Sequence, residues 1–274
     1  MTSKKLSDWT FVAFDTETTG GYPVGSEIVE FGAVKWQGGQ EVGRLEFLFK
    51  PSEPMADFII GIHGITNEMV SQADKIEKHI KTIHDFFRDS IVVAHHAPFD
   101  MGFLAYDFEK YGLDLNFPQA LCTSLLARKW IRGSINHKLQ TLISFLKLDQ
   151  GQAHRALDDA KACLGVLFKC FDQMGWDKSL EDAYKSQGKN LNWANYSLLG
   201  SANAQGKELI KALQQKKDVD MVYASGRSQG KVQRLKPLGI VRNPDGDYLS
   251  AICYSDNTKK RYYLNRINDV LMVY

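Results

Sequence analysis

Three groups of acidic residues, each next to an apolar element, lie in the N-terminal part of this chain. Asp15 and Glu17 come at the end of the apolar run FVAFD, and Asp100 follows a short apolar segment and a turn. Asp159 lies in the sequence HRALDD, five residues after His154. Carboxylates in such positions can bind divalent cations, and a neutral imidazole beside them can accept a proton.

Local geometry allows these side chains to act together. Residues two apart in an extended strand project to the same side, so Asp15 and Glu17 share a face. On a helix, His154 and Asp159 lie about 140° apart around the axis, so they can flank one opening without stacking. Asp158 points elsewhere on the same helix, and we expect it to be solvated.

Four carboxylates that converge on one point repel one another unless cations lie between them. Oxygen ligands without cysteine, with positions open for water and phosphate, favour Mg²⁺ or Mn²⁺. Two such ions about 3.5–4 Å apart promote in-line displacement at a phosphodiester, by activating water and stabilising the leaving 3′-oxygen. We therefore expect two Mg²⁺ or Mn²⁺ ions as cofactors, with His154 as the candidate base.

Each signal also has a purely structural interpretation. A D-x-E sequence is common in surface loops, Asp100 suits the N-cap of a helix, and His154 suits a helix start. The occurrence of all three groups in order, each tied to an apolar element, favours a common site.

The motifs FDTETTG, AHHAPFD and HRALDD resemble, in order, the three exonuclease motifs of the DnaQ-like DEDDh 3′→5′ exonucleases. The segment IHGIT, Ile62–Thr66, is similar to a run that this family carries between its first two motifs. The resemblance covers about residues 9–174 and implies an RNase H-like fold. It also implies DNA or RNA 3′ ends as substrates.

The same resemblance implies roles for individual residues. The metal ligands would be Asp15, Glu17, Asp100 and Asp159, with His154 as the general base. The residues that line the pocket for the terminal nucleotide would be Thr16, Thr18, His63, Ile65 and Phe99. One position departs from the family pattern, because His96 stands where an asparagine is usual.

The hydrophobic pattern predicts the elements that must position these residues. Strands are expected over 11–15, 27–36, 44–50 and 91–94, and helices over 73–88, 100–111, 139–148 and 154–174. The segment 122–130 fits a short strand or a helix. Strands first, then alternating helices and strands, predict an α/β fold with a mixed sheet flanked by helices.

Composition and charge divide the chain into two parts. The 274 residues are 44% hydrophobic and 24% charged, which excludes disordered, collagen-like and disulfide-scaffold proteins. Residues 1–184 carry 19 Lys and Arg against 25 Asp and Glu, whereas residues 185–274 carry 15 against 7. The net charges of −6 and +8 indicate two units with different partners.

Several features predict a cytoplasmic protein. The N-terminus lacks an apolar region behind its two lysines, and no segment is apolar for about 18 residues, so neither a secretory signal nor a membrane span is expected. The four cysteines are scattered and are expected to be buried, reduced thiols.

The C-terminal part predicts a small all-β module. Residues 175–206 are polar and suggest a linker, and Lys207–Lys217 suits a basic amphipathic helix. Five short strands are expected over 219–224, 232–242, 248–254, 261–264 and 270–274, forming a curled barrel. The predicted domains are therefore 1–174, 175–206 as linker, and 207–274.

Basic and aromatic residues alternate within this module, which suits phosphate contact with base stacking or simply a soluble surface over an aromatic core. The sequences RLKPLG, GDYLSA and RYYLNRI resemble the WYL domain, an SH3/Sm-like barrel associated with nucleic-acid or small-ligand binding. The Trp-Tyr-Leu triplet that gives the WYL domain its name is incomplete here, because Asp247 stands in place of the tryptophan before Tyr248 and Leu249. The candidate ligand-binding residues are Lys259, Arg261 and Arg266.

The leading hypothesis is thus a metal-dependent 3′→5′ exonuclease whose C-terminal domain binds nucleic acid or a regulatory ligand. The alternative is a non-catalytic nucleic-acid or nucleotide sensor that uses an exonuclease shell. The complete set of acids argues against this alternative.

Overall fold

The computed structural model describes residues 4–149, 151–226, 228–242 and 246–274, which form two compact units. The first unit contains the chain up to Thr19, Ile28–Met101 and Leu115–Ala194. The second contains Gly20–Glu27, Gly102–Asp114 and Asn195–Tyr274. Each unit has its own hydrophobic core.

The first unit is built on a mixed five-stranded sheet with the order β3-β2-β1-β4-β5. Its strands are β1 (Phe11–Thr18), β2 (Ile28–Gln37), β3 (Gln40–Leu48), β4 (Ile91–Ala94) and β5 (Leu121–Cys122). β2 runs antiparallel to both β1 and β3, whereas β4 runs parallel to β1 and β5. The β2–β3 hairpin turns at Gly38 and Gly39, whose φ angles of 59° and 86° suit a type I′ turn. The predicted strands and mixed sheet are confirmed.

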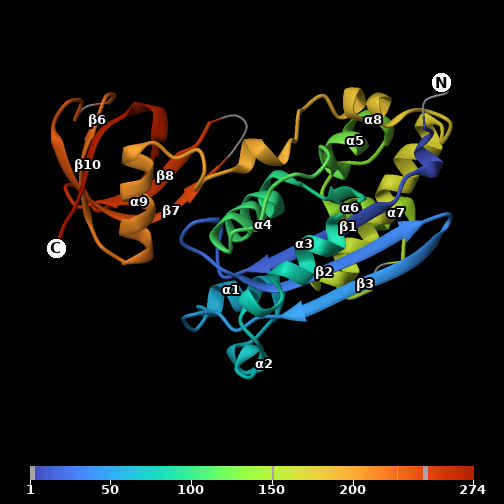
Figure 1. Cartoon of the computed structure of the whole chain (residues 1–274), viewed down its shortest axis with the longest axis horizontal. Coiled ribbons are helices and arrows are strands. Elements are labelled where there is room, and N and C mark those ends of the chain that lie inside the picture. Colours follow the sequence, from blue (N-terminus) through green and yellow to red (C-terminus); the bar gives the residue numbers. More distant parts are fainter. Residues whose placement is uncertain (1–3, 150, 227, 243–245) are drawn as a thin grey trace. The chain divides into compact units, whose positions relative to one another are not determined.

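Helices lie on both faces of this sheet (Figure 1). The helices in this part of the chain are α1 (Asp57–His63), α2 (Asn67–Val70), α3 (Ile80–Phe87), α4 (Pro98–Lys110, of which Gly102 onward belongs to the second unit), α5 (Thr123–Trp130), α6 (Leu139–Leu146), α7 (Ala156–Met174) and α8 (Leu180–Gln187). Alternate residues of β1 face opposite sides of the sheet. Phe11 packs against Phe171 of α7, whereas Phe14 packs against Phe87 of α3, so these two helices lie on opposite faces.

The longest predicted helix begins two residues later than expected. The sequence predicts a helix from His154, but α7 starts at Ala156. His154 has a left-handed φ of 60° and Arg155 is extended, so the chain turns sharply before the helix. This turn is what directs His154 toward the carboxylates described below.

The polar segment 175–206, where the composition predicts a linker, contains regular structure. It forms α8 and the 3₁₀ helix η3 (Trp193–Tyr196). Ser179 caps α8 by accepting a hydrogen bond from Asp182 N–H, and the Asp182 carboxylate accepts one in return from Ser179 N–H. The side chains of Leu191, Trp193 and Tyr196 are fully buried, which gives this polar segment apolar anchor points.

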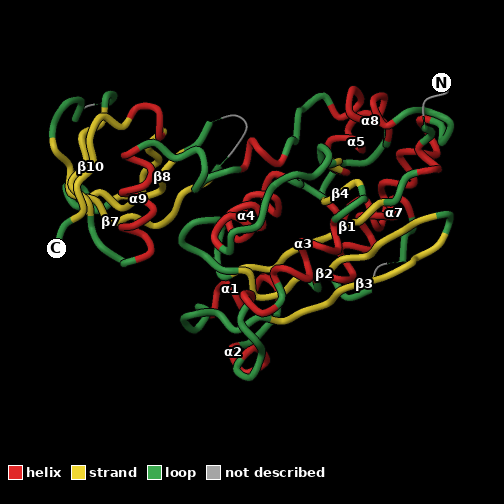
Figure 2. Tube along the Cα trace, viewed as in Figure 1, coloured by secondary structure: helices red, strands yellow, loops and turns green. Residues whose placement is uncertain are grey.

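The second unit contains an antiparallel five-stranded sheet with the order β10-β6-β7-β8-β9. Its strands are β6 (Val219–Tyr223), β7 (Val232–Val241), β8 (Tyr248–Cys253), β9 (Thr258–Tyr263) and β10 (Ile267–Met272). Helix α9 (Ala204–Gln214) packs against β7 and β10 (Figure 2). Within the described ranges, β9 and β10 lie at the two edges and do not pair with each other. The five predicted strands are confirmed, and closure into a barrel is not seen.

Two short segments from the N-terminal part of the sequence are built into the second unit. Val24 pairs with Ile240 of β7 through two backbone hydrogen bonds of 3.0 and 3.4 Å. The Glu109 carboxylate accepts hydrogen bonds from the backbone N–H groups of Leu198, Leu199 and Gly200. Gly20–Glu27 directly follows the D-x-E-T-T motif in sequence, and Gly102–Asp114 directly follows the first turn of α4.

All four cysteines are free and buried, as predicted. In the part of the chain that the structure describes, no helix has both the length and the apolar character needed to cross a membrane.

Candidate functional site

Asp15 and Glu17 lie near the C-terminal end of β1, where the strand leaves the core of the first unit. In register with β2, Asp15 lies opposite Gly32 and Glu17 lies opposite Glu30. The strand alternation places both acids on one face, as predicted. The two threonines between and after them, Thr16 and Thr18, are buried on the other face.

Asp100 is held in the first turn of α4, and its side chain is only 3% exposed. Its Oδ1 accepts a hydrogen bond from Thr16 N–H at 3.2 Å and another from the Thr16 hydroxyl at 2.7 Å. Burial raises the pKa of Asp100 to about 7, although the hydrogen bonds from Thr16 favour the ionised form. Thr16 therefore ties the second acidic motif to the first.

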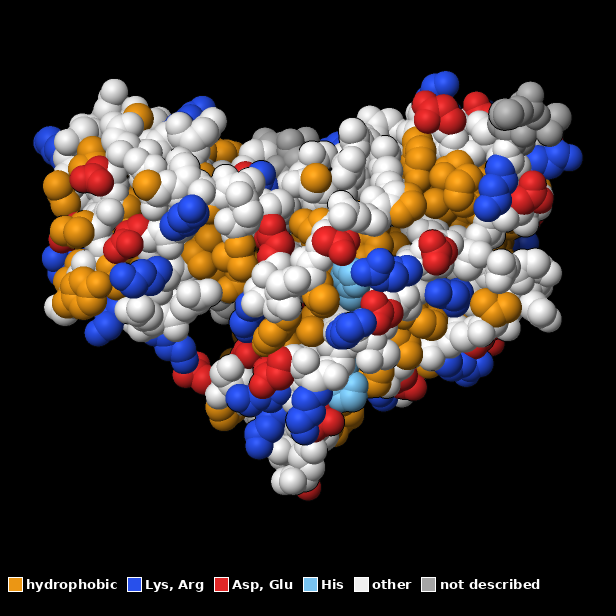
Figure 3. All heavy atoms as spheres, viewed as in Figure 1, with side chains coloured by type: hydrophobic (Ala, Val, Ile, Leu, Met, Phe, Trp, Pro, Cys, Tyr) orange, Lys and Arg blue, Asp and Glu red, His pale blue; other side chains and the backbone are white. Residues whose placement is uncertain are grey.

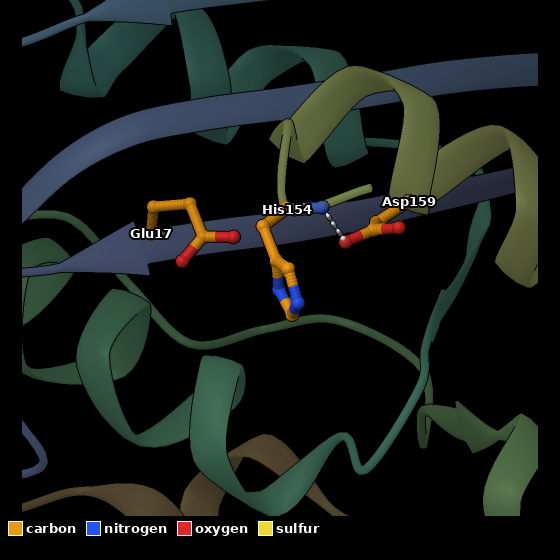
Figure 4. Close-up of side chains that lie close together, drawn as sticks. All are labelled: Glu17, His154 and Asp159. Atoms are coloured by element: carbon orange, nitrogen blue, oxygen red, sulfur yellow. Dashed lines mark hydrogen bonds between the residues drawn. The ribbon is translucent and has the colours of Figure 1, made fainter. Parts of the chain in front are cut away.

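Asp159 and His154 come together at the start of α7. The Asp159 Oδ2 accepts a hydrogen bond from His154 N–H at 3.1 Å, and its Oδ1 accepts one from Gln140 Nε2 at 3.0 Å. One carboxylate oxygen each from Glu17 and Asp159 and one ring nitrogen of His154 all lie within 4.8 Å of one another. Figure 4 shows the exposed imidazole between the two carboxylates.

Mutual repulsion and burial strongly perturb these acids. Burial, followed by the charges of Asp100, Glu17 and Asp159, raises the pKa of Asp15 well above its ordinary value. Burial and the charges of Asp159, Glu30 and Asp100 raise the pKa of Glu17 to about 8. Such a cluster favours a bound cation, because positive charge between the carboxylates removes the repulsion. The all-oxygen donor set fits Mg²⁺ or Mn²⁺.

A fifth acid, Glu30, holds the start of α7 against the sheet. Glu30 is fully buried on β2 and accepts hydrogen bonds from Arg155 Nε at 2.8 Å and from Ala156 N–H at 2.9 Å. Gly32, two residues along β2, allows close approach, since a Cβ there would lie 2.1 Å from the backbone nitrogen of Leu157. Sequence reasoning missed Glu30 and Gln140. The signal for Glu30 was a lone acid within the apolar run IVEFGAV.

The predicted nucleotide pocket residues lie in different environments. His63 ends α1, and its Nδ1 accepts a hydrogen bond from Ile65 N–H at 3.0 Å. Burial lowers the pKa of His63; the charge of Glu30 opposes this effect, and that of His154 adds to it. Ile65 is fully buried in a cluster with Val29, Met55, Ile59 and Val70, whereas Phe99, next to Asp100, is partly exposed.

His96 occupies a left-handed backbone position, with a φ of 63°. Asparagine, aspartate and histidine adopt this conformation more readily than most residues, so histidine can replace the usual asparagine without changing the turn. Its neighbour His95 has a structural role, because its ring nitrogens bond to the Thr123 hydroxyl at 2.8 Å and to the His137 carbonyl at 3.0 Å. Burial lowers the pKa of His95 to about 4.

The second unit carries a basic–aromatic face on β8, β9 and the 3₁₀ helix η4 (Leu264–Arg266). It is defined here by Lys259, Arg261, Arg266 and the rings next to them. Lys259 Nζ lies 5.3 Å from the centre of the Tyr22 ring, and the Arg261 guanidinium lies 4.9 Å from that of Tyr248. The Arg266 guanidinium lies 5.5 Å from the Tyr263 ring. The three predicted basic residues are thus exposed and stacked on tyrosines.

Tyr22, which sequence reasoning did not include, is held on this face by its own contacts. Its hydroxyl lies 3.0 Å from Ser250 Oγ, and its ring packs over Gly239, where a Cβ would lie 2.2 Å from Tyr22 Cβ. Burial acts to raise the pKa of Tyr22, but the hydrogen bonds to Lys259 and Ser250, together with the charges of Lys259 and Arg261, outweigh it and lower the pKa.

Two family profiles match the chain. An exonuclease family described as RNase_T matches residues 12–167, and the WYL domain matches residues 207–272. Both matches confirm the resemblances seen in the sequence.

Two of the curated relatives that resemble this chain are much longer proteins. The PolC-type DNA polymerase III of Bacillus cereus is 33% identical over 217 residues, which are 75% of this chain but 15% of that protein. A putative bifunctional exonuclease/endonuclease of Mycobacterium tuberculosis is 35% identical over 178 residues, 62% of this chain and 28% of that protein. The chain therefore spans only a small part of these relatives.

Solved structures share the fold. Exonuclease X in complex with 5′-overhanging duplex DNA is 28% identical, with a TM-score of 0.50, covering 65% of this chain and 99% of that chain. Escherichia coli exonuclease I in complex with a dT13 oligonucleotide has a TM-score of 0.56 at 17% identity and covers 89% of this chain and 55% of that chain.

Proposed function

Because this chain belongs to the family of DEDDh 3′→5′ exonucleases and carries a C-terminal WYL domain, we propose that it removes nucleotides from the 3′ end of a DNA or RNA strand by metal-dependent hydrolysis. The observation that carries the proposal is the approach of His154 to the carboxylates of Glu17 and Asp159, which come from two separate motifs. Asp15 and Asp100 lie close enough for their charges to act on one another and on this group. The proposed division is an exonuclease domain over 1–174, a connecting segment over 175–206 and a WYL domain over 207–274.

The family implies two Mg²⁺ or Mn²⁺ ions, which Asp15, Glu17, Asp100 and Asp159 would hold. Such ions, when bound, lower the pKa of water and stabilise negative charge on a leaving 3′-oxygen. The raised pKa values of Glu17 and Asp100 support this role, because carboxylates in this arrangement bind a cation more readily than they remain ionised together.

His154 is the proposed general base. In the reaction, a water oxygen bonds to the terminal phosphorus while the bond to the 3′-oxygen of the preceding nucleotide breaks. The water proton goes to the His154 imidazole, and the leaving 3′-oxygen takes a proton from solvent. The products are a nucleoside monophosphate and a strand with a new 3′-hydroxyl. The hydrogen bond between His154 N–H and Asp159 supports this assignment, since it fixes the backbone that carries the ring.

The terminal nucleotide would lie beside Thr18, His63, Ile65 and Phe99, with Thr16 holding Asp100. His63 Nδ1 already accepts a hydrogen bond, so the neutral ring carries its proton on Nε2 and can donate to a substrate oxygen. The partly exposed ring of Phe99 can pack against a base or sugar.

We also propose that the basic–aromatic face binds nucleic acid or a regulatory anion. Guanidinium and ammonium groups held over tyrosines offer phosphate contact beside stacking surfaces. The antiparallel order of the five strands is compatible with the small SH3/Sm-like barrel expected from the sequence.

The decisive experiment compares two adjacent acids. Asp159 faces the cluster, whereas Asp158 accepts a hydrogen bond from Gln152 N–H and pairs with Lys161. Digestion of 3′-labelled single-stranded and duplex DNA and RNA should depend on Mg²⁺ or Mn²⁺. Asp159→Asn should reduce the rate by about 10²- to 10³-fold, while Asp158→Asn stays close to wild type. Equal rates for both variants, or a folded wild type without activity on every strand, would contradict the proposal.

A further inference from the structure

A cavity of about 700 Å³ lies in the first unit, away from the four acids. It is formed by the end of α5 and the residues after it, the end of α6 and the last turns of α7. Its lining residues are Lys129, Trp130, Ile131, Arg132, Phe145, Leu146, Lys169, Asp172 and Gln173.

The cavity is cationic, with three basic side chains and one acid. Asp172 is already engaged: it accepts a hydrogen bond from Trp176 Nε1 at 2.9 Å, and Lys169 lies 3.8 Å away. Lys129 and Arg132 have no carboxylate within ion-pair distance anywhere in the described ranges of the chain. The cavity therefore offers positive charge that the protein itself does not neutralise.

This charge stands out against the rest of the domain. Residues 115–148 contain five Lys or Arg and no Asp or Glu, although the chain up to residue 184 carries a net charge of −6. On the face that Figure 3 shows, side chains of both signs are interspersed. A polyanion that approaches this domain is thus attracted by local clusters rather than by a field of one sign.

The apolar residues that line the cavity are suited to contact with a nucleic-acid base. Trp130, Ile131, Phe145 and Leu146 are apolar, and the Phe145 side chain is 45% exposed, so its ring is accessible for stacking. The Trp130 indole N–H is buried and has no hydrogen-bond partner among the described residues.

The cavity is connected to the carboxylate cluster by two helices. Helix α6 carries Gln140, which bonds to Asp159, and also Phe145 at the cavity. Helix α7 carries Asp159 and, ten residues later, Lys169. At 1.5 Å per residue the two sites are about 15 Å apart along α7. A stacked strand with one phosphate per 3.4 Å covers that distance in about four or five nucleotides.

We propose that this cavity is a strand-binding subsite of the exonuclease, taking phosphates and one base of nucleotides about four or five positions from the 3′ end. Lys129, Arg132 and Lys169 bind the phosphates, and a base rests on Phe145. This inference rests on the proposed function, because it takes the strand whose 3′ end lies at the carboxylates. With such a subsite, the enzyme binds strands long enough to reach it more tightly than shorter strands.

The test measures binding in EDTA, where no hydrolysis occurs. The full chain is titrated against 5′-fluorescein-labelled dT3 and dT12, with the triple variant Lys129→Gln, Arg132→Gln, Lys169→Gln. The triple variant should weaken dT12 binding at least tenfold, and it should reduce the slope of log affinity against log salt by about 2. Binding of dT3, which is too short to reach the cavity, should not change. Phe145→Ala should weaken dT12 binding without changing the salt slope.

The matched control replaces three exposed lysines outside the cavity: Lys50→Gln, Lys75→Gln, Lys178→Gln. Thermal melting of both triple variants checks that they fold. The inference is overturned if the cavity variant binds dT12 as wild type does, if dT3 weakens equally, or if the control loses as much affinity. If the wild-type protein has no hydrolytic activity, and the cavity variant still loses affinity for dT12 alone in EDTA, the subsite stands and the proposed function fails. If dT12 is hydrolysed with the same KM by the cavity variant, the subsite fails and the function stands.

Discussion

Asp100 and Asp159 in the first unit are 3% and 5% exposed, whereas Lys259 and Arg261 in the second unit are exposed and lie over tyrosine rings. Each acid is fixed by hydrogen bonds from other elements of its unit, among them those from Thr16 and Gln140. The two cations lie two residues apart on one strand, so one face of β9 is enough to present them.

Buried carboxylates and exposed cations differ in the structural support that they need. Buried like charges are unfavourable unless a ligand neutralises them, so a rigid framework must hold them together. Exposed cations keep their hydration, and their arrangement contributes little to stability. Substitutions in the framework of the acids should therefore damage folding and catalysis together, whereas substitutions on the basic–aromatic face should change only ligand binding.

The largest effect is expected from Gly32→Ala. The new Cβ would lie 2.1 Å from the Leu157 backbone nitrogen, and backbone cannot move aside as a flexible side chain can. Displacement of α7 should cost about 1–3 kcal/mol of unfolding free energy and remove most of the hydrolysis. Gly43→Ala is the matched control, because its Cβ would meet only the Phe86 ring at 3.4 Å. Denaturant melts and initial rates measure both, and equal effects would show that α7 is not held at Gly32.

A smaller loss is expected from Glu30→Gln. The amide can still accept from Ala156 N–H, but the ion pair with Arg155 is lost, and the start of α7 becomes less well fixed. We expect kcat to fall about tenfold to a hundredfold with little change in KM. Glu46 also faces Arg155, at 3.6 Å, but it is half exposed, so Glu46→Gln should stay within about twofold. A parallel loss in both variants would assign the effect to the surface charge of Arg155.

The acids themselves could be predicted from the sequence because each lies at the end of a strand or the start of a helix. Asp15 directly follows the apolar run within β1 and Asp100 comes after β4, and such transitions are visible in the local pattern of residues. The mixed sheet was predictable for the same reason. The five strands of the second unit were also found, although β9 begins three residues earlier than expected.

The framework could not be predicted, because it depends on which distant elements touch. Nothing local to Gly32 shows that the start of α7 will pack against β2. Gln140 contacts Asp159 only because α6 and α7 pack side by side. The segment 175–206 looked like a linker by composition, yet Trp193 is fully buried within it. Tyr22 belongs to the second unit although it follows the first motif by only a few residues.

In the metal-free protein, the destabilising effect of the acidic cluster should appear as a dependence of stability on pH. Burial and repulsion raise the pKa of Glu17 from 4.5 to about 8, so the folded state holds this proton more tightly than the unfolded state. Stability should therefore fall as pH rises from about 4.5 to about 8. In EDTA, Glu17→Gln should gain Tm relative to wild type between pH 5 and pH 8, and Mg²⁺ or Mn²⁺ should raise the wild-type Tm most at pH 8. A Tm difference that does not vary with pH would mean that the acids are not coupled in solution.

The smallest effect is expected on the basic–aromatic face. Lys259→Gln with Arg261→Gln removes two cations that lie over Tyr22 and Tyr248, and neither has a carboxylate partner among the residues that the structure describes. Single-strand affinity in EDTA should fall only a few fold, and the salt slope should decrease by about 1.4, at 0.7 per phosphate contact. Lys207→Gln with Lys231→Gln, two exposed lysines of the same unit, should leave the slope unchanged. Both pairs should melt like wild type. An unchanged slope for Lys259 and Arg261 would separate this face from phosphate binding, whereas a fall in Tm would show that these cations, like the buried acids, are part of the framework of their unit.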